Sequence, residues 1–331
     1  MIALGSPASA EPAAIKGLNA WVLGALPDNI QQVLDLGVSI VRVDLPWEQV
    51  EPVPNQFEWQ KLDRLVEAAR AGKIEVLFTL RSISSWGTAV KADPKDLYHH
   101  ASRPKSMSDW ERFVQRLAER YKGQGVHYEI ENEVNSNFWS GSLADYLELL
   151  PASYRVIKAE DPEAKVLASA MACGVILNPK TPLERQRLSS QHDDWLESIL
   201  ATKAFDVINV HDYYFPDGPA VNGWTFQSYL EHIIAFAQGA GVDDRPIWIT
   251  EMGYISRPVP TGGRTDNASP EKQAAWLTAA FHEAAARGVE HAFWLFLRDA
   301  PNTGYFGSMG LLGAGNVPRP AWQAYKAIGQ P

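Results

Sequence analysis

The sequence predicts an α/β protein built as a single (β/α)8 barrel, the TIM barrel fold, with long loops at the carboxyl face of the sheet. From Ile15 onward, short β-favouring runs alternate with segments of helical period, which is the pattern of a parallel sheet covered by helices. Eight such pairs fit into about 315 residues, roughly 40 per pair, which suits a barrel core of about 250 residues enlarged by loops. No linker or shift in composition divides the chain, so residues 15–331 are expected to form one domain.

The expected strands and helices follow one another in strict alternation. The strand runs lie at Ile15–Asn19, Ser39–Asp44, Glu75–Leu80, Val126–Asn132, Lys165–Ser169, Asp206–His211, Ile247–Glu251 and His291–Leu297. The helical runs lie at Pro27–Leu36, Trp59–Ala71, Ser108–Tyr121, Leu143–Ala159, Asp194–Thr202, Phe226–Gln238, Pro270–Arg287 and Arg319–Ile328. The long inserts all follow strands, at Arg81–Pro104, Met171–His192 and Tyr254–Ser269. Because such loops build the active site of this fold, the functional residues are expected at the carboxyl ends of the strands.

The composition excludes several classes of protein. A formal charge of -9 and a pI near 5.4 argue against a nucleic-acid or anionic-membrane partner, since phosphate binding needs clustered Lys and Arg. The longest apolar runs are far shorter than the roughly 20 residues that a membrane span needs. The single cysteine, Cys173, cannot form an internal disulfide and is expected to be a small buried residue, so the fold depends on packing.

Residues 1–14 are expected to form an N-terminal extension outside the barrel. Ala8-Ser9-Ala10 before Glu11-Pro12 has the small-x-small form of a signal-peptidase site, although MIALG is too short for a full signal sequence. The extension therefore suggests the remnant of an export signal, which would place the protein in the periplasm or outside the cell. The alternative is a cytoplasmic protein.

Two β-favouring runs end in a glutamate. The stretch Val126–Glu133 (VHYEIENE) closes with Asn132 and Glu133, and Pro246–Glu251 (PIWITE) closes with Glu251. A single Glu that ends a strand is more often a solvated loop residue. Strands four and seven lie on opposite sides of a barrel mouth, however, so these two carboxylates are expected to face each other across the axis. Glycoside hydrolysis needs two opposed carboxylates, one to protonate the leaving oxygen and one to attack or stabilise the sugar cation.

With these residues, the chain resembles the clan A glycoside hydrolases, retaining (β/α)8 enzymes that include cellulases, mannanases and β-xylosidases. In that clan the acid/base is the Glu of an Asn-Glu pair ending strand four, and the nucleophile is a Glu ending strand seven. The resemblance implies these roles for Glu133 and Glu251, and it covers nearly the whole chain from Gly17 to the C-terminal helix. Family 5 and the single-barrel relatives of family 39 are the most similar, since no strand-rich domain follows Ile328.

The resemblance extends to further strands of the barrel. It implies that Arg42, in VRVD on strand two, steadies the nucleophile; an ordinary interior ion pair with Glu129 is the alternative. It implies that His211 and Tyr213, in VHDYY on strand six, belong to the site, with the tyrosine donating a hydrogen bond to the nucleophile. Trp294, in AFWLF at the end of strand eight, would floor the subsite for the attacked sugar, with core packing as the alternative.

The chemistry of these groups follows from the residue types alone. The amide of Asn132 can donate a hydrogen bond to a sugar 2-hydroxyl, a contact that strengthens as the ring becomes cationic. Glu133 must be protonated near neutral pH, so burial or a neighbouring anion should raise its pKa. Glu251 must stay ionised, and Arg42 together with the Tyr213 hydroxyl would hold its pKa low.

The predicted loops carry further candidates. Trp86 and Trp139 are expected to rim the mouth and to pack against sugar rings, with loop packing as the alternative. The strand-four motif departs from the Trp-Asn-Glu-Pro form found in part of the clan, because Glu131 stands in place of the Trp and Val134 in place of the Pro. Glu131 is then either a solvated loop charge or a third carboxylate near the substrate.

Other chemistries lack their motifs. The sequence contains no HExxH, no paired cysteines, no phosphate-binding Gly motif and no Gly-x-Ser-x-Gly, and the adjacent His99-His100 do not have ligand spacing, so no cofactor and no metal is expected. The sequence therefore predicts a retaining β-glycoside hydrolase that cleaves a poly- or oligosaccharide by double displacement. Three alternatives stay open: a transglycosidase with the same residues, a carbohydrate-binding pseudoenzyme, and a barrel whose two Glu serve metal or enolate chemistry.

Overall fold

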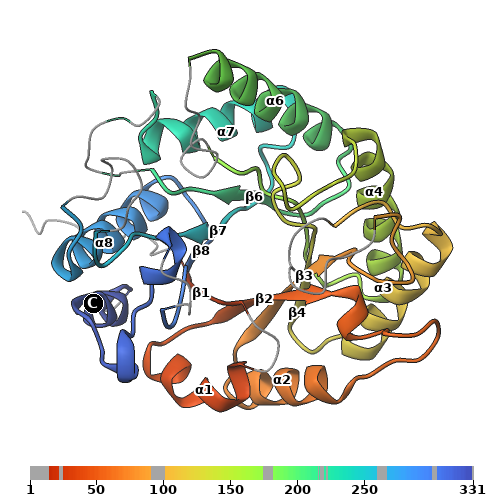
Figure 1. Ribbon diagram of the computed structural model, residues 1–331, viewed down its shortest axis with the longest axis horizontal. Coiled ribbons are helices and arrows are strands. Elements are labelled where there is room, and N and C mark those ends of the chain that lie inside the picture. Colours follow the sequence, from red (N-terminus) through yellow and green to blue (C-terminus); the bar gives the residue numbers. More distant parts are fainter. Residues whose placement is uncertain are drawn as a thin grey trace, which may run out of the picture.

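Eight parallel strands form one sheet at the centre of the computed structural model, which describes residues 15–21, 25–90, 101–173, 182–214, 216, 220, 223–258, 267–299 and 304–329. The strands are β1 (Ile15–Trp21), β2 (Ile40–Pro46), β3 (Glu75–Arg81), β4 (Val126–Ile130), β5 (Val166–Ala168), β6 (Ile208–His211), β7 (Ile247–Met252) and β8 (His291–Trp294). They are hydrogen-bonded in the order β5-β4-β3-β2-β1-β8-β7-β6. The two end strands meet through a parallel bridge between Leu167 and Val207, so the sheet curls into a nearly closed barrel (Figure 1). The predicted (β/α)8 fold is confirmed.

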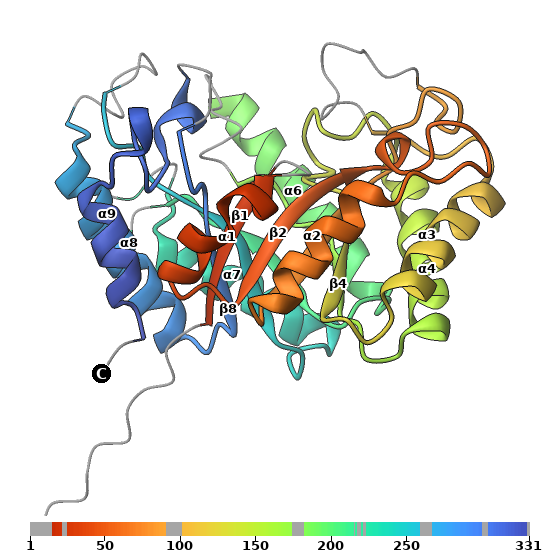
Figure 2. The ribbon, with the colours of Figure 1, turned by 90° about the horizontal axis from the view of Figure 1, so that it is seen from below.

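Helices surround this barrel on its outside (Figure 1). They are α1 (Ala25–Asp35), α2 (Gln60–Ala71), α3 (Met107–Tyr121), α4 (Leu143–Glu160), α6 (Pro182–Ala201), α7 (Phe226–Ala240), α8 (Pro270–Ala286) and α9 (Pro320–Ala327). The short 3-10 helices η1 (Trp47–Gln49), η2 (Tyr305–Ser308) and η3 (Ala314–Asn316) follow β2 and β8. In the side view of Figure 2, β1 and β2 run upward, so the carboxyl ends of the strands open toward the top of the picture.

Capping side chains fix where several of the helices begin. Ser142 and Asp145 form a reciprocal capping box at the start of α4, and Thr225 and Ser228 do so at the start of α7. The side chain of Ser269 caps the first turn of α8. These contacts satisfy backbone N–H groups that have no partner within the helix. The loops that follow β4, β6 and β7 therefore end at defined residues.

Alternation along the strands divides the barrel interior into layers. The lower layer is apolar and consists of Ile40, Leu77, Leu167, Val207, Trp248 and Phe293, all of them buried. Two residues further along β2, β3, β6 and β7, the buried interior side chains are polar: Arg42, Thr79, Asn209 and Thr250. This polar layer lies on the carboxyl side of the apolar layer, and it supports the pocket described below.

Several element boundaries differ from the predicted ones, and three of these differences affect the interpretation of the site or of the loops. β4 and β8 end at Ile130 and Trp294, short of the predicted Asn132 and Leu297. α6 begins at Pro182, inside the segment that was expected to be a loop. The first part of α6 has the sequence PLERQRLSSQHD, in which only the two leucines are apolar, so apolar periodicity did not reveal it.

Some sequence-based expectations fall on other parts of the chain. The N-terminal extension with Ala8-Ser9-Ala10 and the pair His99-His100 lie outside the described residues. Cys173 is buried, as expected. Among the helices that the structure describes, none combines the length and the apolar character that a bilayer crossing requires.

Gly17 offers a test of how tightly the lower layer is packed. A Cβ built on Gly17 would lie 2.5 Å from the ring of Phe293, so Gly17→Ala should lower the free energy of unfolding by about 1 to 3 kcal/mol. Urea unfolding followed by circular dichroism would measure this loss. The matched control is Gly239→Ala in α7, where the added Cβ meets no atom within 4 Å, and this variant should be neutral or stabilised. Equal stability of the two variants would contradict the packing of Phe293 against β1.

Candidate active site

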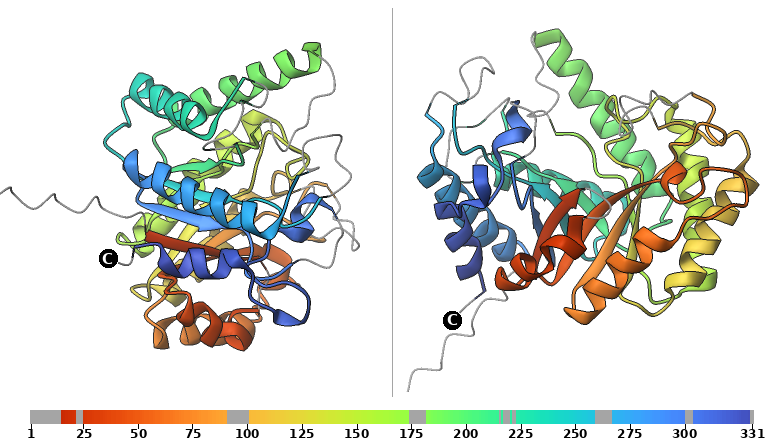
Figure 3. Two further views of the ribbon diagram at one scale, coloured as in Figure 1. Left: turned by 90° about the vertical axis from the view of Figure 1, so that its left-hand side faces the viewer. Right: turned by 60° about the horizontal axis from the view of Figure 1, so that its bottom comes forward.

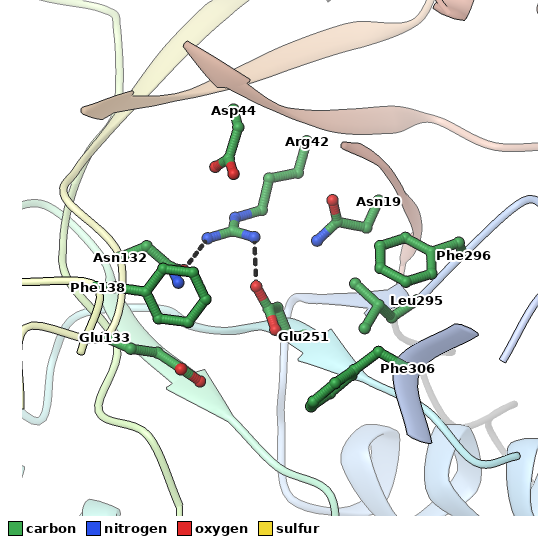
Figure 4. Close-up of a pocket in the computed structure, with 10 residues that line it drawn as sticks. All are labelled: Asn19, Arg42, Asp44, Asn132, Glu133, Phe138, Glu251, Leu295, Phe296 and Phe306. Atoms are coloured by element: carbon green, nitrogen blue, oxygen red, sulfur yellow. Dashed lines mark hydrogen bonds and ion pairs between the residues drawn. The ribbon is translucent and has the colours of Figure 1, made fainter. Parts of the chain in front are cut away.

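A pocket opens at the carboxyl ends of the strands, where the predicted residues gather (Figure 4). It contains about 470 Å³ of space not filled by protein atoms, part of which is open to solvent. The lining residues come from the ends of several strands and from the loops after them: Asn19, Arg42, Asp44, Asn132, Glu133, Phe138, Glu251, Leu295, Phe296 and Phe306. The structure therefore brings Glu133, Glu251, Arg42 and Asn132 together, as the sequence predicted.

The backbone after β4 takes an unusual course that directs Glu133 into the pocket. Glu131 and Glu133 have φ angles of 65° and 43°, in the left-handed region that residues with a Cβ seldom adopt. Such a conformation costs about 1 to 3 kcal/mol per residue and occurs mostly at functional sites. The predicted strand therefore ends at Ile130, and the side chains beyond it no longer alternate with a period of two.

Arg42 holds three partners in the polar layer. Its Nε donates to Glu129 Oε2 at 2.6 Å, its Nη1 to Glu251 Oε1 at 2.7 Å, and its Nη2 to Asn132 Oδ1 at 2.7 Å. The contact of Arg42 with Glu251, which the resemblance implied, and the alternative ion pair with Glu129 are thus both present. Because the arginine binds the oxygen of Asn132, the amide group of this side chain remains available as a donor at the pocket wall.

Glu251 receives two strong donors. The Tyr213 hydroxyl donates to Glu251 Oε2 at 2.6 Å, and Arg42 occupies the other oxygen. Burial alone would raise the pKa of Glu251, but the charges of His211 and Arg42 and the hydrogen bonds from Tyr213 and Arg42 hold it below the usual value. Glu251 is therefore an ionised carboxylate at neutral pH, directed into the pocket from β7.

Glu133 lies in the opposite electrostatic environment. Its side chain is buried, with 2% of its surface exposed. Burial raises the pKa of Glu133, the nearby charge of Glu251 raises it further, and the hydrogen bond with His211 offsets only part of this effect. Two carboxylates whose closest oxygens lie within 4.8 Å of each other thus have pKa values shifted in opposite directions.

A chain of hydrogen bonds determines where the proton of His211 lies. Asn209 Nδ2 donates to Glu129 Oε1 at 2.7 Å, so its Oδ1 is the acceptor that faces Thr250. Thr250 donates to that oxygen at 2.6 Å, and its own oxygen then accepts from His211 Nε2 at 3.1 Å. His211 therefore carries a proton on Nε2. Its Nδ1 lies 2.8 Å from Glu133 Oε1, a distance at which two acceptors would repel each other unless one proton lies between them.

Trp294 does not take the place that the resemblance implied. It is fully buried, its Nε1 donates to the Met309 carbonyl at 3.0 Å, and its ring contacts Trp276 of α8. The reason is strand alternation: Phe293 belongs to the interior layer, so the next side chain faces the helices. Leu295 lines the pocket instead, next to Phe296.

The two predicted loop tryptophans also pack within the protein. Trp86 donates to the Glu51 carbonyl at 2.8 Å and its ring meets that of Trp47. Trp139 is 5% exposed and donates to the Ser142 carbonyl at 3.1 Å. Neither is among the lining residues in the described part of the chain. The apolar faces of the pocket come from Leu295 and three aromatic residues that the sequence analysis did not single out, Phe138, Phe296 and Phe306.

Two polar lining residues were also missed. Asn19 ends the first predicted strand run, and Asp44 ends the VRVD run just as the two glutamates end theirs, so the same signal could have found both residues. Burial raises the pKa of Asp44, while the nearby arginines Arg81 and Arg42 lower it. Glu131 is neither solvated nor in the pocket, because it is fully buried and accepts from Arg81 Nε at 3.1 Å and from Ser82 N at 2.6 Å.

Within the described residues, two groups of three side chains offer ligand atoms close enough to bind one metal ion. They are Glu133, His211 and Glu251 in the pocket, and His192, Asp193 and His232 outside it. In the pocket the guanidinium of Arg42 already supplies positive charge 2.7 Å from Glu251. A second cation there would be repelled, so this group suits acid–base chemistry better than metal binding.

Comparison with known proteins extends this description. No protein-family model matches the chain. A beta-xylosidase from Caldicellulosiruptor saccharolyticus is 23% identical over 299 residues, which cover 81% of this chain and 54% of that protein. The chain therefore spans about half the length of this curated relative.

Solved structures share the fold over almost the whole chain. A family 39 glycoside hydrolase from Bacteroides cellulosilyticus WH2 superposes with a TM-score of 0.68 at 17% identity, over 96% of this chain and 63% of that one. GH5_18 from Streptomyces cattleya, solved with GlcNAc, gives a TM-score of 0.65 at 17% identity, over 96% of this chain and 80% of that one. The fold is that of the clan A glycoside hydrolases, and the resemblance to families 39 and 5 is confirmed.

The buried contacts of Arg42 should dominate the stability of the site. Arg42→Met would leave Glu129 and Glu251 buried without their cation, so the free energy of unfolding at neutral pH should fall by about 3 to 5 kcal/mol. The loss should shrink as the pH falls and Glu251 becomes protonated. Urea unfolding at neutral and acidic pH would measure both effects.

A matched control is Arg103→Met, since Arg103 is 41% exposed and pairs with Glu148 at 2.7 Å. Such surface pairs contribute about 0 to 1 kcal/mol. Similar losses for the two arginine variants would contradict the central position of Arg42.

Proposed function

We propose that the protein is a retaining β-glycoside hydrolase that acts on a poly- or oligosaccharide by double displacement, with Glu133 as acid/base and Glu251 as nucleophile. The observation that carries this proposal is the pair of carboxylates within 4.8 Å whose pKa values shift apart. Retaining enzymes have carboxyl groups about 5 to 5.5 Å apart, whereas inverting enzymes need about 6.5 to 9.5 Å to admit a water molecule. The short separation favours direct attack by Glu251.

In the first step, a Glu251 oxygen attacks the anomeric carbon while Glu133 gives its proton to the leaving glycosidic oxygen. The electron pair of the broken C–O bond stays on that oxygen, and the sugar is held as an ester of Glu251. Arg42 and Tyr213 keep the attacking carboxylate ionised. Asn132 can donate to the 2-hydroxyl as the ring becomes cationic.

In the second step, Glu133 is a carboxylate and takes a proton from water, whose oxygen attacks the anomeric carbon and releases Glu251. His211 supports both states of Glu133, because its Nδ1 can accept the acid's proton or donate to the carboxylate. A second inversion restores the starting configuration, so the product keeps the β-anomer.

The comparisons suggest which sugars to test first. The curated relative is named a beta-xylosidase, which makes an aryl β-xyloside the first substrate, beside aryl β-glucosides and β-mannosides. Leu295, Phe296 and Phe306 form the apolar side of the pocket, and such faces suit the apolar faces of sugar rings. Activity on none of these β-glycosides, or on oligosaccharides with the same linkages, would contradict the proposal.

The pH profile of kcat/KM should be a bell with limbs from the two carboxylates. Glu251 must be ionised and its pKa is lowered, so it sets the acidic limb; Glu133 must be protonated and its pKa is raised, so the basic limb belongs mainly to the Glu133–His211 pair. Glu133→Gln should remove the basic limb for a substrate with an activated leaving group, which needs no proton. The control Glu148→Gln, at an exposed glutamate, should keep both limbs. A basic limb that persists unchanged in Glu133→Gln would assign the proton to another group.

The stereochemistry of azide rescue should separate the two roles. Glu251→Ala should be nearly inactive on a β-glycoside, and azide should restore turnover by entering the vacated space and releasing the α-azide. In Glu133→Ala, azide should instead attack the glycosyl-enzyme and release the β-azide. Proton NMR of the products, and of the wild-type product in the first minutes of hydrolysis, would identify each anomer. An α-anomer from the wild type, or a β-azide from Glu251→Ala, would overturn the assignment of Glu251.

A further inference from the structure

Outside the pocket, histidines of two neighbouring helices contact one carboxylate. His192 and Asp193 belong to α6 and His232 belongs to α7, helices that lie side by side on the outside of the barrel (Figures 1 and 3). His192 Nδ1 and His232 Nε2 each lie 2.9 Å from Asp193 Oδ1. The three atoms lie within 4.8 Å of one another. We call these three residues the α6–α7 triad.

A buried tyrosine prepares His192 to act as a ligand. His192 Nε2 lies 2.9 Å from the hydroxyl of Tyr229, whose side chain is buried. The hydroxyl can donate to Nε2 while Nδ1 carries the proton, and it can accept from Nε2–H once Nδ1 is deprotonated. Histidines that bind metal ions usually have such a partner on the second nitrogen, which fixes the tautomer and the ring orientation. Tyr229 can therefore pair with Nε2 in either tautomer of His192, and Nδ1 faces Asp193.

The other two members are also held in a form that can bind a metal ion. Asp193 Oδ1 lies 2.9 Å from a ring nitrogen of each histidine, so one carboxylate oxygen faces both imidazoles. The ring of His232 packs against Trp224 and Phe236, with centroid distances of 4.7 and 4.9 Å. These contacts restrict the imidazole to an orientation in which Nε2 faces the carboxylate.

We propose that the α6–α7 triad binds a divalent transition-metal ion of the zinc class through His192 Nδ1, Asp193 Oδ1 and His232 Nε2. Two imidazoles and one carboxylate suit Zn²⁺, whereas Mg²⁺ and Ca²⁺ prefer oxygen ligands. With metal–ligand bonds of about 2.0 to 2.2 Å in a tetrahedral site, ligand atoms lie about 3.4 Å apart. The two histidine–carboxylate pairs, now at 2.9 Å, need to separate by about half an ångström. The two histidine nitrogens, which lie within 4.8 Å of each other, need to reach the same spacing. The side chains of Asp193 and His232 are 37% and 21% exposed, which leaves a fourth position for water.

The position of the triad explains what the ion would do. Among the described residues, β5 and β6 are joined by the single bridge between Leu167 and Val207. α6 connects these two strands, and α7 connects β6 to β7. An ion shared by α6 and α7 would link two helices beside the least hydrogen-bonded seam of the barrel. Because an ion that binds only the folded state stabilises it, zinc should raise the melting temperature.

Thermal unfolding and calorimetry test the proposal on the whole chain, after treatment with EDTA and dialysis. Micromolar ZnCl2 near neutral pH should raise the Tm of the wild type by about 3 °C or more, and titration calorimetry should give one zinc ion per chain. MgCl2 should have no effect. His232→Gln and Asp193→Asn should each weaken zinc binding by about tenfold or more and abolish the rise in Tm. The matched control His282→Gln, at an exposed histidine of α8, should keep both.

Binding at the catalytic pocket must be distinguished, because Glu133, His211 and Glu251 also offer three ligand atoms. Glu133→Gln removes one of them and should keep the rise in Tm. The proposal is overturned if zinc does not raise the Tm of the wild type, if the two triad variants respond as the wild type does, or if Glu133→Gln loses the response. The two triad variants alter different helices, and circular dichroism confirms the fold of each before titration.

Discussion

The site depends on one buried cation, the guanidinium of Arg42. A charge removed from water is stabilised only where partners satisfy it fully, and here Glu129, Glu251 and Asn132 do so at 2.6 to 2.7 Å. Arg42 lies on β2, whereas its partners lie on or just after β4 and β7. A single side chain therefore fixes the separation of the two strands that carry the opposed carboxylates. It also keeps Glu251 ionised and orients the amide of Asn132 for donation into the pocket.

Arg42 also influences the protonation of Glu133, through a series of hydrogen bonds that ends at His211. Arg42 binds Glu129 Oε2, and the other oxygen, Oε1, accepts from Asn209 Nδ2 and so fixes the orientation of that amide. From there the hydrogen bonds through Thr250 assign the Nε2 proton of His211. One proton then remains for the contact between His211 and the buried acid. Glu251 and Glu133 thus differ in protonation. Glu251 contacts the guanidinium of Arg42, whereas Glu133 contacts Nδ1 of His211, whose Nε2 already donates its proton to Thr250.

Much of this arrangement could be predicted from the sequence, because strand periodicity is a property of the backbone. Short β-favouring runs identified the eight strands, and a glutamate at the end of such a run marked Glu133 and Glu251, whereas Arg42 was marked by the resemblance to clan A. Side-chain direction beyond a strand end has no such period. For that reason Trp294 was expected in the pocket, whereas Leu295 lines it, and Trp139 was chosen where its neighbour Phe138 contributes. The first half of α6 was not predicted as a helix because its sequence is mostly polar and lacks an apolar stripe.

The departure at Glu131 from the Trp-Asn-Glu-Pro form has a structural role. The left-handed backbone at Glu131 and Glu133 is unfavourable by about 1 to 3 kcal/mol per residue and persists only where neighbouring contacts determine it. The Glu131 carboxylate accepts from Arg81 and from the backbone N–H of Ser82, both at the end of β3, and Arg81 also donates to the carbonyl of Phe138. A buried ion pair thus holds this turn. The pair joins β3, the turn that carries Glu133, and the loop that supplies Phe138 to the pocket. The Glu131 charge, which the sequence analysis placed in solvent or near the substrate, instead stabilises the backbone conformation beside Glu133.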